Sequence, residues 1–279
     1  MKKIGFIDYY LNNWHSDNYP ALIEKYSGGE MKVTCAYGCP DAPITGGKIS
    51  NEAWAEKYGI ELCATIDEVI EKSDFLVVLS PNNPEQHLRL CEKPLMSGKL
   101  TYIDKTYAPD KETALRIFAN AEAHNTPCYS SSALYFSTEL NDIDTDKIHK
   151  IYSRGPGVYE IYSIHQIEPV LKLMKTDPKR VMFLGDKQHP SMVIEFADGR
   201  CAQMYQGTWI DFEITTADEE NNMQIHTIKS DYFVRFIESL IAFFDTGIAP
   251  VTHRQTVNVI ATINAGHKAA QTPFEWVEV

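Results

Sequence analysis

Residues 74–105, DFLVVLSPNNPEQHLRLCEKPLMSGKLTYIDK, decide the fold that this sequence predicts. The apolar run at 75–79 suits a strand that is buried on both faces of a parallel sheet. Pro84 suits the first turn of the helix that follows, and Gly98 ends that helix. A second strand at 100–103 completes a strand–helix–strand unit, whose crossover should be right-handed.

Two polar segments follow these strands directly. Ser80-Pro81-Asn82 comes after the first strand, and Asp104-Lys105 comes after the second. In open α/β sheets, ligands bind beyond the carboxyl ends of the strands. We therefore expect both segments to lie at a ligand site.

The remainder of the first 131 residues alternates in the same way. Further strands are expected at 4–7, 31–37, 63–65 and 127–130, and further helices at 19–26, 50–58 and 109–124, with another brief helix opened by Asp67-Glu68. A Gly- and Pro-rich loop is expected at 38–47. This alternation predicts an α/β domain with a Rossmann-type, doubly wound parallel sheet.

The pattern changes after residue 131. Ala197-Asp198-Gly199 predicts a hairpin between two alternating segments. Other strands are expected at 148–153, 181–185 and 274–279, and helices at 159–174, 232–244 and 256–270. We expect domains at 1–131 and 132–279, the second an α+β domain built on a mostly antiparallel sheet.

The quoted stretch resembles the Gfo/Idh/MocA oxidoreductases. In that family a buried strand precedes a Thr/Ser-Pro-Asn turn, a His that opens the next helix, a Gly-Lys pair, a second strand and Glu-Lys-Pro. The corresponding residues here are Ser80-Pro81-Asn82, His87, Gly98-Lys99 and Asp104-Lys105-Thr106. The last triplet differs at both flanking positions but keeps the lysine. The resemblance implies a dinucleotide-binding-like domain, a substrate and oligomerisation domain, and NAD or NADP as cofactor.

The segment after the first strand departs from the family. A G-x-G-x-x-G sequence normally lets backbone N–H groups approach the pyrophosphate, but no glycine follows Gly5 here. Asp8, followed by Tyr9, stands where a phosphate would pass, and like charges about 4 Å apart repel by roughly 1–4 kcal/mol. Asn12 and Asn13 can adopt the left-handed conformation that glycine otherwise supplies, so a different turn is an alternative.

The second strand is expected to end at Tyr37 instead of the acidic residue that usually holds the ribose. Either the cofactor binds in a modified way, or the fold has lost it. The implied cofactor residues are Asp8, Tyr9, Asn12, Tyr37, Ser80, Pro81, Asn82, His87 and Asp104. The segment 14–17, WHSD, either lines a ligand cleft or is a surface loop that precedes a helix capped by Asp17 or Asn18.

Lys105 is a candidate catalytic residue. In the family this lysine contacts the nicotinamide ribose and the substrate hydroxyl. A strand-end ammonium in a cleft can stabilise a developing alkoxide and move protons. The alternative is a solvated loop lysine paired with Asp104 or Asp110.

His165 is the second candidate. Residues 160–168, EIYSIHQIE, resemble the family helix Asp-x-Gly-x-His-x-x-Asp, whose His is the acid/base for the substrate hydroxyl. The first Asp has no counterpart on the same helix face, but Glu168, about 60° from His165, could orient the ring. A structural His165 is the alternative. A metal site formed by His15, His165 and Glu168 would lack a local ligand spacing.

Composition limits the remaining possibilities. The 26 basic and 38 acidic residues give a net charge of −12, which argues against a nucleic-acid partner. The 6 cysteines form no CxxC pair, as expected of buried free thiols in a reducing compartment. No apolar run approaches the roughly 18 residues of a membrane span, and we expect a cytoplasmic location with no membrane partner.

The leading prediction is an NAD(P)-dependent oxidoreductase that transfers a hydride between the nicotinamide and a sugar- or polyol-like substrate. The alternative is a non-catalytic binding or regulatory protein that kept the fold and lost the cofactor. An antiparallel sheet with an open face invites pairing, so a homodimer or homotetramer is expected.

Overall fold

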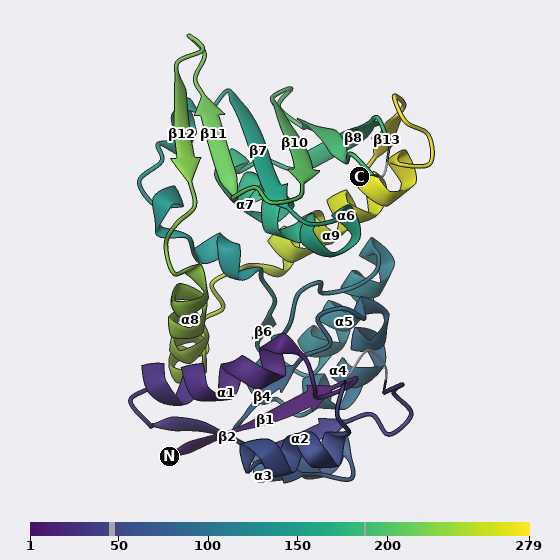
Figure 1. Ribbon diagram of the computed structural model, residues 1–279, viewed down its shortest axis with the longest axis vertical. Coiled ribbons are helices and arrows are strands. Elements are labelled where there is room, and N and C mark those ends of the chain that lie inside the picture. Colours follow the sequence, from purple (N-terminus) through teal and green to yellow (C-terminus); the bar gives the residue numbers. More distant parts are fainter. Residues whose placement is uncertain (45–47, 187) are drawn as a thin grey trace. The chain divides into compact units, whose positions relative to one another are not determined.

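The computed structural model describes residues 1–44, 48–186 and 188–279, which form two compact units (Figure 1). The first unit comprises Met1–Ser131 and Phe236–His253, and the second comprises Ser132–Arg235 and Arg254–Val279. Residues 45–47 of the loop expected at 38–47 lie outside the described residues.

A parallel sheet forms the centre of the first unit. Its described strands lie in the order β3-β2-β1-β4-β5-β6. Their bounds are β1 Lys2–Asp8, β2 Met31–Gly38, β3 Glu61–Leu62, β4 Phe75–Val78, β5 Thr101–Ile103 and β6 Cys128–Tyr129. The chain reverses its direction of travel across the sheet between β1 and β4, which is the usual ligand position in such sheets. The predicted Rossmann-type sheet is confirmed.

Side-chain caps start most helices of this unit. Asn13, Ser50, Thr65 and Asp110 each accept a hydrogen bond from a backbone N–H group in the first turn. The helices are α1 Trp14–Tyr26, α2 Asn51–Tyr58, α3 Ile66–Lys72, α4 His87–Met96 after the 3₁₀ turn η1 Pro84–Gln86, and α5 Lys111–Ala123. The cap at Asn13 makes 14–17 the first turn of α1, so the expected surface loop with a cap at Asp17 or Asn18 is wrong.

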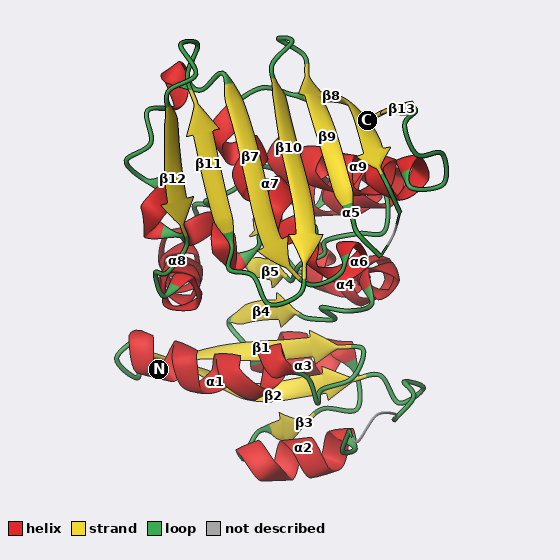
Figure 2. Ribbon diagram, turned by 45° about the horizontal axis from the view of Figure 1, so that its top comes forward, coloured by secondary structure: helices red, strands yellow, loops and turns green. Residues whose placement is uncertain are grey.

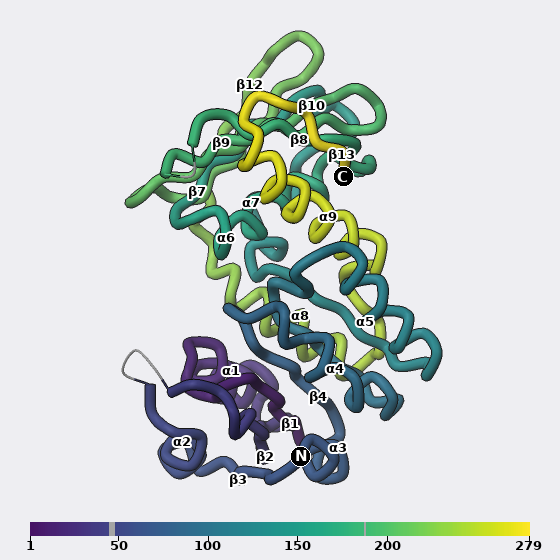
Figure 3. Tube along the Cα trace, turned by 90° about the vertical axis from the view of Figure 1, so that its right-hand side faces the viewer, coloured from purple at the N-terminus to yellow at the C-terminus, as the bar shows by residue number. Residues whose placement is uncertain are grey.

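Helices cover both faces of this sheet. α1 lies on one face and α3 on the other (Figure 1), and α4 and α5 lie side by side (Figure 3). Gly5 lets α3 approach β1, because a Cβ at this position would lie 2.4 Å from Val69 Cγ1 and 2.6 Å from Ser73 Oγ. The glycine of β1 therefore serves helix packing.

Most of α8 Tyr232–Thr246, from Phe236 onward, belongs to the first unit. The ring of Phe236 lies 5.6 Å from Tyr19 and 5.2 Å from Tyr102, and Phe244 stacks on Phe75 at 4.7 Å. These aromatic contacts join Phe236–His253 to the sheet.

The second unit contains a mostly antiparallel sheet (Figure 2). Its described strands lie in the order β12-β11-β7-β10-β9-β8-β13, and only β7 and β10 pair in parallel among them. The predicted hairpin at Ala197-Asp198-Gly199 joins β9 and β10. The bounds are β7 Lys150–Pro156, β8 Pro178–Leu184, β9 Ser191–Phe196, β10 Cys201–Gly207, β11 Glu213–Ala217, β12 Met223–Thr227 and β13 Trp276–Glu278.

Helices lie behind this sheet in Figure 2. They include α7 Ile164–Met174 and α9 His253–Ala269. The short helix α6 Tyr159–Tyr162 precedes α7, and the 3₁₀ turns η2 Ala133–Phe136, η3 Thr138–Leu140 and η4 Thr145–Lys147 lie earlier in the chain. The α+β prediction is confirmed, although β11 and β12 were not predicted and the helix expected at 159–174 is divided at Ser163.

All cysteines are free thiols, and all except Cys201 are buried. Within the described ranges, no helix is both long enough and apolar enough to span a bilayer.

Candidate functional site

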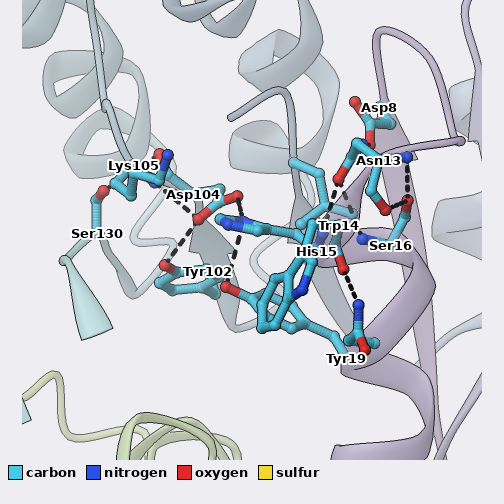
Figure 4. Close-up of polar contacts among 12 residues, drawn as sticks. Asp8, Asn13, Trp14, His15, Ser16, Tyr19, Tyr102, Asp104, Lys105 and Ser130 are labelled. Carbon is cyan, nitrogen blue, oxygen red and sulfur yellow. Dashed lines mark hydrogen bonds and ion pairs between the residues drawn. The ribbon is translucent and has the colours of Figure 1, made fainter. Parts of the chain in front are cut away.

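Three polar side chains of the first unit meet at the carboxyl end of its sheet (Figure 4). Asp104 and Lys105 follow β5, and His15 lies in the first turn of α1. The side chain of Asn13 fixes this turn by accepting hydrogen bonds from the backbone N–H groups of His15 at 3.0 Å and Ser16 at 3.2 Å. We call His15, Asp104 and Lys105 the strand-end cluster.

The carboxylate of Asp104 is the centre of this cluster. Its Oδ2 contacts Nδ1 of His15, and its Oδ1 accepts hydrogen bonds from the Tyr102 hydroxyl at 3.2 Å and the Lys105 backbone N–H at 2.9 Å. Complete burial acts to raise the pKa of Asp104, but the charges and hydrogen bonds of His15 and Lys105 outweigh it and hold this pKa below its ordinary value. Asp104 is therefore an anion at neutral pH.

The amine of Lys105 is shielded from water. Its residue is only 7% exposed, and the described residues offer Nζ no hydrogen-bond partner. Burial lowers the pKa of Lys105, and the charge of Asp104 offsets part of that effect. The alternative of a solvated loop lysine is therefore wrong. A largely buried amine that bonds to none of the described residues marks a position where a polar ligand would bind.

Aromatic rings enclose His15. Tyr19 stacks on the imidazole with ring centroids 5.0 Å apart, and its hydroxyl lies 3.2 Å from Nδ1. Trp14 meets the imidazole edge-on at 5.6 Å. The side chain of His15 keeps 10% exposure while that of Asp104 has 0%. Sequence reasoning placed His15 in a cleft-lining segment but not among the site residues.

Asp8 ends β1, at the place where a glycine cradle would begin. Asn13 Nδ2 donates to Asp8 Oδ2 at 2.8 Å, whereas Asp8 Oδ1 is buried without a hydrogen-bond partner among the described residues. Burial raises the pKa of Asp8 to about 8. Because the neutral carboxyl then predominates at pH 7, the repulsion expected between Asp8 and a phosphate is largely absent.

The amino end of α1 differs from a glycine cradle. The Asn13 side chain already occupies two of the first amide groups, which would otherwise bind a pyrophosphate. Asn12 accepts a hydrogen bond from Ile49 N–H at 3.1 Å and donates to Asp17 at 3.3 Å. Neither Asn12 nor Asn13 is among the described residues with positive φ, so the alternative of a left-handed turn here is not found.

Tyr9 and Tyr37 lie at the ends of β1 and β2, where the ribose acid is missing. The guanidinium of Arg89 lies 5.5 Å from the Tyr9 ring and donates to Cys39 Sγ at 3.5 Å. An arginine near this strand end can hold the 2′-phosphate of NADP. Arg89 therefore adds a cation at this strand end, where it also pairs with Asp41 Oδ2 at 3.4 Å.

The turn after β4 and the connection after β5 are held together by His87. Its ring nitrogens lie 2.6 Å from Leu79 O and 3.0 Å from Tyr107 O, and burial lowers its pKa. Ser80, at φ 89°, opens the turn that continues through Pro81-Asn82. His87 thus positions the two ligand-facing segments.

These residues fit a nicotinamide dinucleotide bound in a modified way. Lys105 supplies an unpaired amine, Asp8 is predominantly neutral with one orphaned buried oxygen, and Arg89 supplies a cation at the β2 end. The phosphate contacts must differ from those of a glycine cradle, because Asn13 occupies the amides of α1.

In the second unit, His165 and Glu168 both contact Ser132. The Ser132 hydroxyl lies 2.6 Å from His165 Nδ1, and the Ser132 N–H donates to Glu168 Oε2 at 2.5 Å. Burial raises the pKa of Glu168 to about 8. Over residues 1–44, 48–186 and 188–279, no three His, Cys, Asp or Glu side chains are grouped to hold a metal.

Comparison with known proteins supports the fold. No family model and no curated protein sequence matches this chain. Scyllo-inositol dehydrogenase from Lactobacillus casei, solved with bound NAD(H) and scyllo-inositol, shares 13% identity at a TM-score of 0.80, with 100% of this chain and 99% of that chain covered. Myo-inositol 2-dehydrogenase from Lactobacillus plantarum shares 14% identity at a TM-score of 0.77, with 100% of this chain and 99% of that chain covered. A probable dehydrogenase from Thermotoga maritima shares 13% identity at a TM-score of 0.79, with 99% of this chain and 98% of that chain covered.

The raised pKa of Asp8 makes a stability prediction. An aspartate in the unfolded chain ionises near pH 4, so from about pH 4 to pH 8 the folded protein holds a proton that the unfolded chain lacks. Stability contributed by this proton falls as the pH rises through that window, at about 1.4 kcal/mol per pH unit. Asp8→Asn removes this pH-dependent loss of stability. The free energy of unfolding of the variant, relative to that of the wild type, should therefore increase from pH 5 to pH 8.

Urea unfolding at several pH values measures this difference. Glu56→Gln, at an exposed position on α2, is the control and should give a pH-independent difference. A pH-independent difference for Asp8→Asn as well would show that Asp8 ionises normally in the folded protein.

Proposed function

We propose that this protein is an NAD(P)-dependent oxidoreductase that transfers a hydride between a nicotinamide cofactor and a sugar- or polyol-like substrate. The observation that carries the proposal is the shielded, unpaired amine of Lys105 beside the ionised Asp104 at the carboxyl end of β5. One solved protein of similar fold, scyllo-inositol dehydrogenase from Lactobacillus casei, contains bound NAD(H) and scyllo-inositol, which supports the same classes of cofactor and substrate.

Lys105 has the properties needed to act on the reacting oxygen. As an ammonium it donates a hydrogen bond to the substrate hydroxyl or carbonyl and stabilises the negative charge that develops there. Its low exposure strengthens this interaction, because water does not screen it. The nicotinamide, when bound, accepts or supplies the hydride.

The cofactor residues in this proposal surround the strand ends. Asp104 orders the Lys105 backbone, and His87 fixes the turn that presents Asn82. The full set that would hold the cofactor is Asp8, Tyr9, Asn12, Tyr37, Ser80, Pro81, Asn82, His87, Arg89, Asp104 and Lys105. Arg89 favours NADP over NAD.

Residues 1–131 would act as the dinucleotide-binding-like domain and residues 132–279 as the substrate and oligomerisation domain. His165, with Glu168, is the residue that the family resemblance implies for proton exchange with the substrate. A homodimer or homotetramer formed through the second sheet belongs to the same proposal.

Cofactor binding should stabilise the protein. NADP at millimolar concentration is expected to raise the melting temperature, since a ligand at 100 times its Kd stabilises a fold by about 2.7 kcal/mol. NAD should give a smaller shift, and Arg89→Ala should remove the difference between the two. No shift with either cofactor would favour a non-catalytic binding or regulatory protein.

Lys105→Met should abolish turnover in a screen of polyols and sugars while leaving the fold intact. Loss of one donor to the reacting oxygen typically lowers kcat by about 10²–10³-fold. Lys111→Ala, at an exposed position on α5, is the matched control and should keep wild-type kcat. A Lys105→Met enzyme with full activity would remove Lys105 from the mechanism.

A further inference from the structure

His15 carries the arrangement found in proton-transfer histidines, a buried carboxylate held against one ring nitrogen. Asp104 Oδ2 contacts His15 Nδ1, while Tyr102 and the Lys105 N–H hold Asp104 Oδ1 in place (Figure 4). A carboxylate at Nδ1 orients the ring, selects the tautomer in which Nε2 is the base, and stabilises the imidazolium.

The imidazole is also in the right place within the first unit. The carboxylate that holds it belongs to the residue directly before Lys105, so one side chain connects the base to the strand end that carries the amine. Since β4 lies between β1 and β5 in the sheet, this contact spans the end of β4 at the usual ligand position. The described residues offer no hydrogen-bond partner to His15 Nε2, and the side chain keeps 10% exposure.

The Nδ1 atom of His165 contacts a hydroxyl group, whereas that of His15 contacts a carboxylate. The neutral hydroxyl of Ser132 lies 2.6 Å from His165 Nδ1. Glu168 accepts from the Ser132 N–H, and burial raises its pKa to about 8, so it is predominantly uncharged at pH 7. An uncharged carboxyl stabilises an imidazolium less than the ionised Asp104 does.

We infer that His15 exchanges the proton with the reacting hydroxyl of the substrate and that Asp104 is its positioning residue. The inference rests on the proposed function and deepens it. In the oxidising direction the substrate O–H bond breaks and its proton forms the Nε2–H bond of His15. The carbon loses its hydride to the nicotinamide, the C–O bond becomes a carbonyl, and Lys105 donates to that oxygen.

This role of His15 gives a chemical reason for the missing glycines after β1. Asn13 caps α1 and starts it at Trp14, which places His15 in the first turn facing β5. A glycine at the cap position would free the amides for a phosphate but would lose the side chain that bonds both His15 N–H and Asp8. This segment positions a histidine base instead of forming a glycine-rich turn that binds phosphate.

The test compares histidine variants of the full-length protein with NADP, NAD and a panel of polyols. His15→Gln should lower kcat by about 10²–10⁴-fold, the usual contribution of general acid–base catalysis, and should remove one limb of the pH profile of kcat. The melting-temperature shift given by NADP should be unchanged. His124→Gln, on the exposed end of α5, is the control and should keep wild-type kcat. His165→Gln should reduce kcat less than His15→Gln.

Chemical rescue separates a proton-transfer role from a structural one. His15→Ala leaves space beside Asp104, and added imidazole should restore turnover in proportion to its concentration, whereas His165→Ala should not respond. Asp104→Asn should lower kcat without imidazole rescue.

The outcomes distinguish this inference from the proposed function. Suppose that the wild type turns over polyols. If His15→Gln then keeps the wild-type kcat, or if imidazole does not rescue a folded His15→Ala variant, the role of His15 is overturned and the oxidoreductase proposal stands. A wild type with neither a cofactor shift nor turnover overturns both.

Discussion

The contact between the carboxylate of Asp104 and the imidazole of His15 is the interaction on which the site depends. It joins the connection after β1 to the end of β5, two segments separated by β4 in the sheet. Because Asp104 is completely buried, it stays ionised only while His15 and Lys105 compensate its charge. Removal of either partner would raise the pKa of Asp104 toward the value that burial alone favours. The three side chains therefore form one electrostatic unit.

Asp8 and Glu168 show the opposite response to the same burial. Burial outweighs the hydrogen bonds of Asp8, and it outweighs the Ser132 hydrogen bond and the Lys172 charge at Glu168, so the pKa of each acid rises to about 8. The first unit thus contains two buried aspartates with different charges at pH 7, a neutral one beside Asn13 and an ionised one beside His15. Environments that push the pKa values of neighbouring acids apart are typical of functional sites.

Much of the fold could be predicted from local pattern. The apolar run in β4, the glycine after α4 and the Ala197-Asp198-Gly199 hairpin each depend on neighbouring residues alone, and each is confirmed. The strand-end positions of Lys105 and Asp104 followed from the same reasoning. The predicted start of α1 was wrong because Asn13, Asp17 and Asn18 are all suitable capping residues, and the structure uses Asn13.

The remainder of the site depends on contacts between distant residues. His15 and Asp104 are 89 residues apart, and no spacing in the chain announces their contact. The protonation of Asp8 depends on its complete burial, and its polar neighbours in the sequence do not predict a buried position. The return of α8 to the first unit depends on aromatic contacts with Tyr19, Tyr102 and Phe75.

The protonation state of the His15 ring tests this account most directly. Nitrogen NMR of the protein labelled with ¹⁵N-histidine, with the signal assigned by its loss in His15→Gln, reports which ring nitrogen carries the proton in the neutral imidazole. The account predicts a proton on Nδ1, shared with Asp104, and a bare Nε2. A neutral ring protonated on Nε2 would contradict it, because His15 would then donate no proton to Asp104 Oδ2 and would present no base to a substrate.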